Sequence, residues 1–223
     1  MKCLPIITLD GPAGVGKSTL AKRLATILGI PYLDTGAMFR TIALRLGPGA
    51  EALPEDELRA RCKAFRFKLQ GGGEHSVLLC NGVPVGPEIR TEEVGQMASK
   101  SAAVPQVRSW LIDLQRDLAV TQNVIMDGRD IGTVVLPDAT VKIFLTAAPE
   151  ARARRRWLEY QQKGMEVAFE DVLADVKQRD YQDTHRAAAP LKQAEDAVLL
   201  DTSDLNFEQS LAAMKKIIAE KVN

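Results

Sequence analysis

A glycine-rich segment near the start of the sequence has residue types and spacing that could bind phosphate. The residues from Gly11 to Ser18 fit the pattern G-x-x-x-x-G-K-[ST], which is that of a phosphate-binding loop. Glycine lets the backbone curl so that successive N–H groups face one anion, and the following helix adds the positive end of its dipole. In such a loop Lys17 reaches the β- and γ-phosphates of a nucleotide, and Ser18 binds Mg²⁺. The residues expected to hold the nucleotide are Gly11, Pro12, Ala13, Gly14, Val15, Gly16, Lys17, Ser18 and Thr19.

The elements on either side of this loop are the ones that phosphate binding requires. The apolar run Leu4–Leu9 predicts a buried strand, and Leu20, Leu24 and Ile27 have the spacing of one helix face within Gly16–Leu28. Later in the chain, short apolar runs alternate with long amphipathic stretches, which favours a parallel sheet with helices on both faces. The other predicted strands are Ile30–Leu33, Val124–Met126, Val141–Leu145 and Ala197–Leu200, and the other long predicted helices are Glu92–Leu118, Pro149–Lys163, Phe169–Arg186 and Phe207–Lys221.

One segment departs from this alternation. Phe65–Val85 contains short β-like runs that are interrupted by Gly71–Gly73 and by Asn81-Gly82, and Asn-Gly is a typical hairpin turn. We therefore predict a small antiparallel insertion on the α/β core. The glycine run fits either a hairpin tip or a disordered loop.

The composition is that of an ordinary globular protein. The 223 residues are 46% hydrophobic and 26% charged, and 29 basic residues balance 29 acidic ones. This balance gives no general attraction to nucleic acid or to acidic membranes, so neither is expected as a partner. No apolar run approaches the length of a membrane span, and the N-terminus lacks a signal-peptide pattern. Cys3, Cys62 and Cys80 fit no disulfide framework or zinc site, which favours reduced thiols and a cytoplasmic location.

The sequence after the loop narrows the choice among nucleotide-binding proteins. The D-x-x-G and N-K-x-D motifs of a GTPase do not occur in it. It contains instead LDTGAMFRTIA at 33–43 and NVIMDGRDIGTVVLPDATVKIFLTA at 123–147, together with EIRTEEV at 88–94, APL at 189–191 and two arginine-bearing helical stretches. Through these stretches, from Ile6 to Lys221, the chain closely resembles bacterial cytidylate kinases.

The resemblance implies a fold and a domain organisation. The fold is that of P-loop nucleoside monophosphate kinases, an α/β structure with a five-stranded parallel sheet flanked by helices, a small antiparallel insertion and a helical lid. Residues 1–223 would form a single domain. Its core would comprise residues 1–59, 91–148 and 188–223, its acceptor-side insertion about 60–90 and its mobile lid about 149–187.

The resemblance also implies an activity and an acceptor site. The activity is transfer of the γ-phosphoryl group of ATP to CMP or dCMP, which gives CDP or dCDP and ADP in the presence of Mg²⁺. Thr35 stands where the family often has serine, and the hydroxyl is kept. By resemblance, the acceptor site contains Thr35, Arg40, Ser99, Arg108, Asp127, Arg129, Asp130, Arg179, Asp183 and Arg186.

The chemistry of these residue types suits a nucleotide acceptor. Arginine binds phosphate with two parallel hydrogen bonds, and Arg129 would grip the acceptor phosphate in this way. Asp127 would be an outer-shell partner of Mg²⁺. Asp130 can accept a hydrogen bond from the cytosine amino group, which uracil lacks, so Asp130 would favour cytosine. Ser99 and Arg108 would read the rest of the base edge.

Further charged residues are predicted on two later helices. Arg179, Asp183 and Arg186 follow at i, i+4 and i+7 and would share one helix face. In the family, the first two of these positions contact the pentose, and the later arginine helps to bind phosphate.

The stretch RARRRW, residues 152–157, predicts a basic lid. Its arginines would close over the transferring phosphate and stabilise the charge that spreads there, and we assign this role to Arg152 and Arg156 rather than to Arg154. The predicted catalytic set is Lys17, Arg129, Arg186, Arg152 and Arg156. A general base is not required, because the acceptor is already an ionised phosphate oxygen.

Plainer interpretations remain open on local sequence alone. The stretch MDGRD could be an ordinary turn after a strand, and both arginine-bearing helices could present solvated, ion-paired faces. Two other functions compete with a CMP kinase: a P-loop kinase for another small acceptor such as UMP, and a slow nucleotide-binding regulatory module. Trp110 and Trp157 are interpreted as packing residues. No additional apolar stripe stands out, which favours a monomer.

Overall fold

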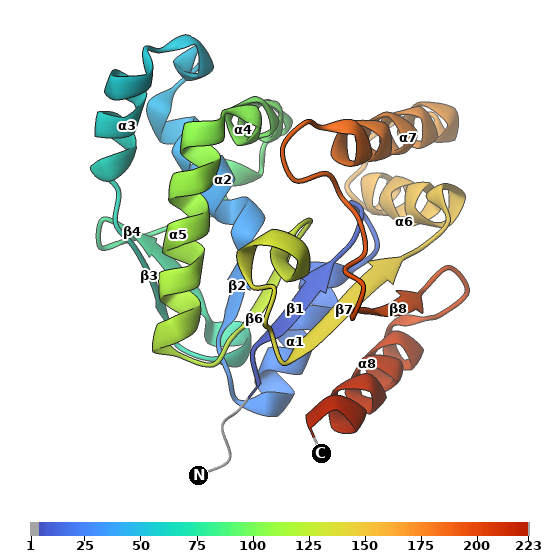
Figure 1. Ribbon diagram of the computed structural model, residues 1–223. Helices are drawn as coiled ribbons and strands as arrows, with labels where there is room; N and C mark the ends of the chain where they lie inside the picture. Colours follow the sequence, from blue (N-terminus) through green and yellow to red (C-terminus); the bar gives the residue numbers. More distant parts are fainter. Residues whose placement is uncertain (1–4, 223) are drawn as a thin grey trace.

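A five-stranded parallel sheet forms the centre of the computed structural model, which describes residues 5–222 (Figure 1). The strands lie in the order β2-β6-β1-β7-β8, so the glycine-rich loop leaves the middle strand. The predicted strand at Leu4–Leu9 is observed from Ile7 onward, and its Leu4 lies outside the described residues. The five strands are β1 (Ile7–Asp10), β2 (Tyr32–Asp34), β6 (Ile125–Gly128), β7 (Val141–Thr146) and β8 (Val198–Asp201).

The register of the sheet brings the ends of its strands to one edge. Asp10, the last residue of β1, pairs with Gly128 of β6 on one side and with Phe144 of β7 on the other. Asp34 of β2 pairs in turn with Asp127. Parallel strands place their carboxyl ends together, so the segments that follow β1, β2 and β6 all begin at the same edge.

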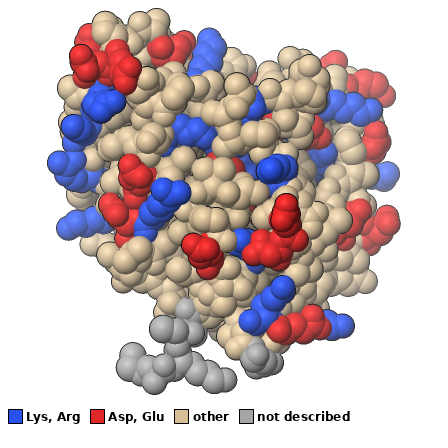
Figure 2. All heavy atoms as spheres, in the orientation of Figure 1, with Lys and Arg blue, Asp and Glu red and all other residues tan. Residues whose placement is uncertain are grey.

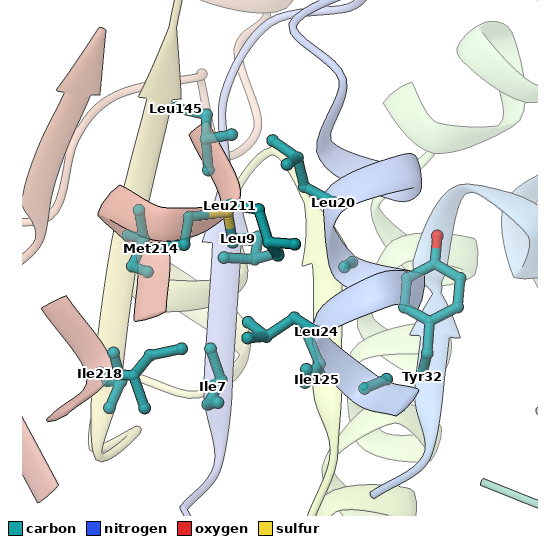
Figure 3. Packing of buried hydrophobic residues seen from close by; sticks show 14 of the residues in the cluster. Ile7, Leu9, Leu20, Leu24, Tyr32, Ile125, Leu145, Leu211, Met214 and Ile218 are labelled. Atoms are coloured by element: carbon teal, nitrogen blue, oxygen red, sulfur yellow. The ribbon is translucent and has the colours of Figure 1, made fainter. Parts of the chain in front are cut away.

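Helices cover both faces of the sheet. On one face, Leu20 and Leu24 of α1 and Met214 of α8 pack over Leu9 and neighbouring strand residues (Figure 3). On the other face, Met38, Ile42 and Leu111 are fully buried with residues of β2 and β6. The prediction of a parallel sheet covered on two faces is confirmed. The long helices are α1 (Lys17–Leu28), α2 (Thr35–Leu46), α3 (Glu55–Lys63), α4 (Glu92–Ala103), α5 (Pro105–Thr121), α6 (Pro149–Gln162), α7 (Phe169–His185) and α8 (Phe207–Val222).

The predicted antiparallel insertion is confirmed as a three-stranded sheet. Its strands β3 (Phe67–Gln70), β4 (Val77–Cys80) and β5 (Val83–Pro84) pair in sequence order. The turn between β4 and β5 is the predicted Asn81-Gly82, and both residues have positive φ (55° and 80°). Asparagine and glycine tolerate this conformation better than other residues, which explains the turn.

The glycine run of the insertion packs against the core. It leads into the short 3-10 helix η2 (Gly73–His75), which lies against α1. The N–H of Gly73 donates to the carbonyl of Ile30 (2.9 Å), and the N–H of Glu74 donates to the hydroxyl of Thr26 (2.9 Å). The N–H of Tyr32 donates to the Ser76 hydroxyl (2.9 Å). The loop therefore attaches the insertion to α1 and to the edge strand β2.

Two features of the helices differ from the predictions. The single helix predicted over Glu92–Leu118 is wrong: α4 and α5 are separate helices, and Val104 between them is extended (φ −78°, ψ 116°). The cause is Pro105, because a proline disfavours helical geometry in the residue before it and is well suited to begin a helix. Helix α3 was not predicted, because only Leu58 and Cys62 of its nine residues are buried.

We predict that Gly73→Ala destabilises the fold more than Gly82→Ala. Both glycines have positive φ, but a Cβ on Gly73 would lie 2.7 Å from the Thr26 Cα, whereas a Cβ on Gly82 would meet nothing within 4 Å. Gly82→Ala should cost about 1 kcal/mol of unfolding free energy, for backbone strain alone. Gly73→Ala should cost about 2–4 kcal/mol, because a steric clash adds to the strain. Urea unfolding of the two variants measures the difference, and equal losses would contradict the packing of η2 on α1.

Candidate functional site

The glycine-rich loop has the geometry of an anion-binding loop. Gly14 and Gly16 have positive φ (80° and 89°), and α1 begins at Lys17, directly after the loop. Gly11 approaches β7 so closely that a Cβ there would lie 2.0 Å from the Leu145 carbonyl oxygen. A side chain at position 11 would therefore displace the loop from the sheet.

Lys17 is buried at the centre of this loop. Its ammonium group donates to the carbonyl oxygens of Gly11 and Pro12, both at 2.7 Å. Burial and the nearby Arg129 lower the pKa of Lys17 to about 7, although three aspartates oppose the shift. A phosphate anion at the loop would act like these aspartates, because a nearby negative charge favours the charged ammonium form of Lys17.

Asp127 connects the loop with β2 and α2. Its carboxylate accepts hydrogen bonds from the hydroxyls of Ser18 (2.7 Å) and Tyr32 (3.2 Å), and its backbone carbonyl accepts from the Thr35 hydroxyl (2.7 Å). Burial and the neighbouring Asp34 raise the pKa of Asp127 to about 7. The residues predicted to bind Mg²⁺ and one acceptor residue, Thr35, are thus in direct contact.

Asp130 lies between two arginines. It is buried, and its carboxylate forms ion pairs with Arg108, from α5, and with Arg186 (3.4 Å). Arg108 is also buried, and its Nε has no hydrogen-bond partner among the described residues. Sequence reasoning placed Arg186 on a helix, and this is wrong: α7 ends at His185, and Arg186 is extended (φ −63°, ψ 140°). Its guanidinium turns toward Asp130 from the loop that follows α7.

Arg129 pairs with Asp183 of α7. The Arg129 Nε donates to the Asp183 carboxylate at 2.7 Å. Burial alone would raise the pKa of Asp183, but Arg129, Arg179 and Arg186 outweigh it, and the pKa lies below its usual value. The predicted phosphate ligand and the predicted pentose ligands are therefore adjacent.

Two of the remaining acceptor residues, Arg40 and Arg179, interact electrostatically with Arg129. Arg40 of α2 donates to the carbonyl oxygens of Ile89 (3.1 Å) and Thr91 (3.4 Å), and Ser99 is exposed on α4. The pKa values of Arg40 and Arg179 are lowered by burial first and then by other arginines. These guanidinium groups repel one another, so an anion among them would be stabilised.

Arg152, which we predicted as an arginine of the lid, is held by protein acceptors. It is 2% exposed, and its guanidinium donates to the carbonyl oxygens of Ala147 (2.9 Å) and Ala13 (3.1 Å) and pairs bidentately with Asp180 of α7. It thus joins α6 to the glycine-rich loop and to α7. In this arrangement its donors are occupied by protein acceptors, and it does not point freely toward solvent.

Two of the other arginines of α6 make contacts within the protein, and the third is exposed. Arg155 donates to the carbonyl of Thr202, in the loop between β8 and α8. Arg156 donates to the Tyr160 hydroxyl (2.8 Å) and its guanidinium lies 5.4 Å from the centre of that ring. Arg154 is exposed. Trp157 packs against Phe169 in a small core between α6 and α7, which agrees with its interpretation as a packing residue.

Sequence reasoning missed three residues that shape the site. Tyr32 holds the Asp127 carboxylate, and Arg90 pairs with Asp34 (2.5 Å), whose other oxygen accepts from the N–H of Ala37 at the start of α2. Asp10 accepts hydrogen bonds from the N–H groups of Ile131 and Gly132. Two of these residues lie next to motifs that the sequence analysis used: Arg90 lies in the stretch EIRTEEV, and Asp10 lies directly before Gly11. The sequence does not indicate which residues they contact.

Two cavities border the site. One, of about 420 Å³, lies at the ends of β7 and β8, and its lining includes Pro12, Thr146, Arg152 and Ser203. The other, of about 320 Å³, lies between β2 and the insertion and is lined in part by Tyr32. The first cavity adjoins the glycine-rich loop and has the size of a small ligand site.

Other features of residues 5–222 give a mixed surface without a preformed metal cage. Basic and acidic side chains are interspersed over the face shown in Figure 2. Within the described residues, no three His, Cys, Asp or Glu side chains gather in a way that could hold a metal ion. None of the helices in this range is long and apolar enough to cross a membrane. Cys62 and Cys80 are free and buried, and Cys3 lies outside the described residues.

Comparison with known proteins decides the family. The family model described as cytidylate kinase matches residues 7–220, nearly the whole chain. The chain belongs to the cytidylate kinase family. A cytidylate kinase from Nitratidesulfovibrio vulgaris (strain Hildenborough) is 53% identical, over 92% of this chain and 88% of the relative. A cytidylate kinase from Thermosipho melanesiensis is 47% identical, over 96% and 97%.

A solved structure supports the fold of this cytidylate kinase family member. Shikimate kinase from Bacteroides thetaiotaomicron superimposes with a TM-score of 0.50 at 16% identity, and the match covers 96% of this chain and 98% of that one. At this identity the likeness concerns the fold alone. The family and the P-loop kinase fold, both predicted from the sequence, are confirmed. The roles of individual site residues and the boundaries of insertion and lid stay predictions.

We predict that Arg152→Ala destabilises this cytidylate kinase family member, whereas Arg154→Ala does not. Removing Arg152 leaves Asp180 and two backbone carbonyls without their buried partner, and breaking such a pair costs about 3–5 kcal/mol of unfolding free energy. Arg154 is an exposed arginine of the same helix, and its loss should change stability by less than about 0.5 kcal/mol. Chemical unfolding of both variants measures the effect. Equal stability of the two would show that the Arg152 contacts do not hold α6 in place.

Proposed function

We propose that this protein transfers the γ-phosphoryl group of ATP to CMP or dCMP. Membership of the cytidylate kinase family supports this activity, and no observation favours a kinase for another acceptor or a regulatory module. The structural observation that carries the proposal is the meeting of two charged groups at one sheet edge. The loop with Lys17 follows β1. Asp127 lies near the end of the paired strand β6, and Arg129 and Asp130 follow that strand directly.

The donor nucleotide would lie along the glycine-rich loop. Its phosphates would accept hydrogen bonds from the loop N–H groups and from Lys17, which would exchange the carbonyls of Gly11 and Pro12 for phosphate oxygens. The nucleoside would occupy the cavity of about 420 Å³ beside Pro12, at the ends of β7 and β8. Arg152 lines this cavity, so it would contact the donor from a fixed position.

The donor set beside Lys17 fits Mg²⁺ bound together with ATP. Mg²⁺ is usually held by one or two protein oxygens and by substrate phosphates rather than by a complete protein cage. Ser18 and Asp127 supply a hydroxyl and a carboxylate 2.7 Å apart, in contact with the loop. Ser18 would hold the ion directly and Asp127 from its outer shell, and the bound ion would supply positive charge that neutralises the phosphates.

The acceptor phosphate would lie among Arg40, Arg129 and Arg186. Two polyanions must approach each other for transfer, so cations on the acceptor side have to offset their repulsion. Arg129 is held by Asp183, and Arg186 by Asp130, which fixes the direction of each guanidinium. The pentose would lie near Arg179 and Asp183, as the family resemblance implies.

Asp130 would select the base. It accepts from Arg108 and Arg186, and a carboxylate can accept further hydrogen bonds. A cytosine amino group would donate to Asp130, whereas the uracil carbonyl would face Asp130 with a second acceptor.

Transfer of the phosphoryl group would depend on alignment and charge neutralisation. Lys17, Arg129 and Arg186 would be the main residues for this, and Arg152 and Arg156 would contribute from the lid. We also propose that the protein acts as a cytoplasmic monomer.

The first test is a panel of phosphate acceptors. Initial rates of ADP formation from Mg-ATP should be high with CMP and dCMP and much lower with UMP, dTMP, AMP, GMP or no acceptor. The same panel with EDTA in place of Mg²⁺ should give almost no turnover. A flat panel with slow ATP hydrolysis alone would overturn the proposed function, and a preference for UMP would favour the alternative acceptor.

We predict distinct kinetic effects for Asp130→Ala and Arg129→Ala. Asp130→Ala should raise KM for CMP far more than KM for ATP, because Asp130 would face only the acceptor base. Arg129→Ala should lower kcat by about 10²–10³-fold, which corresponds to a few kcal/mol of lost transition-state stabilisation. Arg23→Ala is a matched control, since Arg23 is exposed on α1. Steady-state kinetics of the folded variants decide the matter, and an unchanged kcat in Arg129→Ala would contradict its phosphate role.

A further inference from the structure

Asp10 is a buried carboxylate for which the proposed chemistry provides no role. It is the last residue of β1, directly before Gly11, and its side chain is almost fully buried. One carboxylate oxygen accepts from the N–H of Ile131 (2.8 Å), and the other accepts from the N–H of Gly132 (2.7 Å). A single side chain therefore joins the start of the donor loop to the two residues that follow Asp130.

These two N–H groups belong to the first turn of a short π-helix, η4 (Ile131–Val135). The first N–H groups of a helix have no partner inside it, and the side chain of the N-cap residue usually accepts from them. The N-cap residue of η4 is Asp130, but its side chain makes no capping hydrogen bond. Its carboxylate is directed to Arg108 and Arg186 instead. Asp10 thus caps η4 from a neighbouring strand, in place of Asp130.

We propose that Asp10 is a positioning residue for base selection, because by capping η4 it keeps the Asp130 carboxylate available for Arg108, Arg186 and the acceptor base. The inference rests on the proposed function, since it concerns how Asp130 is presented to cytosine.

Loss of Asp10 would create a competitor for the Asp130 carboxylate. The N–H groups of Ile131 and Gly132 would be left buried without an acceptor, which is unfavourable. Aspartate at an N-cap position is among the best acceptors for such groups. Asp130 would therefore turn toward the start of its own helix and away from Arg108. The base edge would then lose the acceptor that distinguishes an amino group from a carbonyl.

The packing around Asp10 supports a fixed distance between β1 and η4. A Cβ on Gly132 would lie 3.0 Å from the Thr8 hydroxyl and 3.3 Å from an Asp10 carboxylate oxygen. Glycine at position 132 thus lets the first turn of η4 approach β1 without crowding the acceptor of these hydrogen bonds. Burial raises the pKa of Asp10 to about 6 even though both N–H groups oppose the shift, and such a perturbed buried carboxylate is typical of functional positions.

The test compares base discrimination in Asp10→Asn, Asp10→Ala and a matched control. Thr8→Val is the control, because Thr8 is fully buried on the same face of β1 and its hydroxyl has no partner among the described residues. For each protein, kcat and KM are measured with CMP, UMP and ATP. The decisive quantity is the ratio of kcat/KM for CMP to that for UMP, because a general loss of stability or of donor binding lowers both values together.

Asp10→Ala should reduce this ratio by about 10-fold or more, while KM for ATP changes by less than about 3-fold. Asp10→Asn should give an intermediate ratio, since its carboxamide oxygen can still accept from one N–H. Thr8→Val should keep the wild-type ratio. Adding Asp10→Ala to Asp130→Ala should reduce the ratio no further, because the side chain that Asp10 presents is already absent.

Several results would overturn the inference. An unchanged ratio in both Asp10 variants would show that Asp10 does not act through the acceptor base, and so would an equal loss of ratio in Thr8→Val. If both Asp10 variants fail to fold, Gly132→Ala takes their place, because its Cβ pushes η4 away from the same carboxylate, and an unchanged ratio there would overturn the inference. Failure of the proposed function looks different: the wild-type protein would then not prefer CMP at all.

Discussion

The parallel pairing of β1 with β6 is the constraint on which the rest of the structure depends. Its register sets Asp10 beside Gly128, so the donor loop and the acceptor residues leave adjacent strands at the same level. Both strands are buried on both faces, so a shift of one residue would move every side chain of the shifted strand to the opposite face and disrupt its packing against the helices there. The relative position of two loops that must meet across one phosphate is therefore fixed by hydrophobic packing rather than by the loops themselves.

Charge is the second organising factor. Arginines pair with aspartates throughout the site. The buried Arg108 and the half-buried Arg186 pair with Asp130, the half-buried Arg129 pairs with Asp183, and the buried Arg152 pairs with Asp180. Buried charges are tolerated only in such pairs. The same pairs hold the guanidinium groups in fixed directions, so little reorganisation is needed when anionic ligands bind among them.

The sequence allowed the sheet, most helices and the insertion to be predicted, because each depends on local patterns of apolar residues, glycine and proline. The break before Pro105 was missed, because the pattern of polar and apolar residues over 92–118 was interpreted as one helix although it contains a proline. What could not be predicted is contact between distant segments. Arg152 and Arg156 were assigned the same lid role from the sequence, yet of these two only Arg152 turns inward to Ala13 and Asp180. The partners of Asp10 lie more than a hundred residues away, and no spacing rule connects them.

The attachments of α6 have a mechanical consequence. This helix and α7 share a small apolar core of their own and so form one stiff unit. Arg152 fastens the unit to the carbonyls of Ala13 and Ala147, and Arg155 fastens it to the carbonyl of Thr202. The ion pair between Asp183 of α7 and Arg129 holds the other helix of the unit as well. To displace α6 and α7 as one body, the contacts at both helices would have to break together, so the resistance to such a displacement is shared among several interactions and does not depend on a single one.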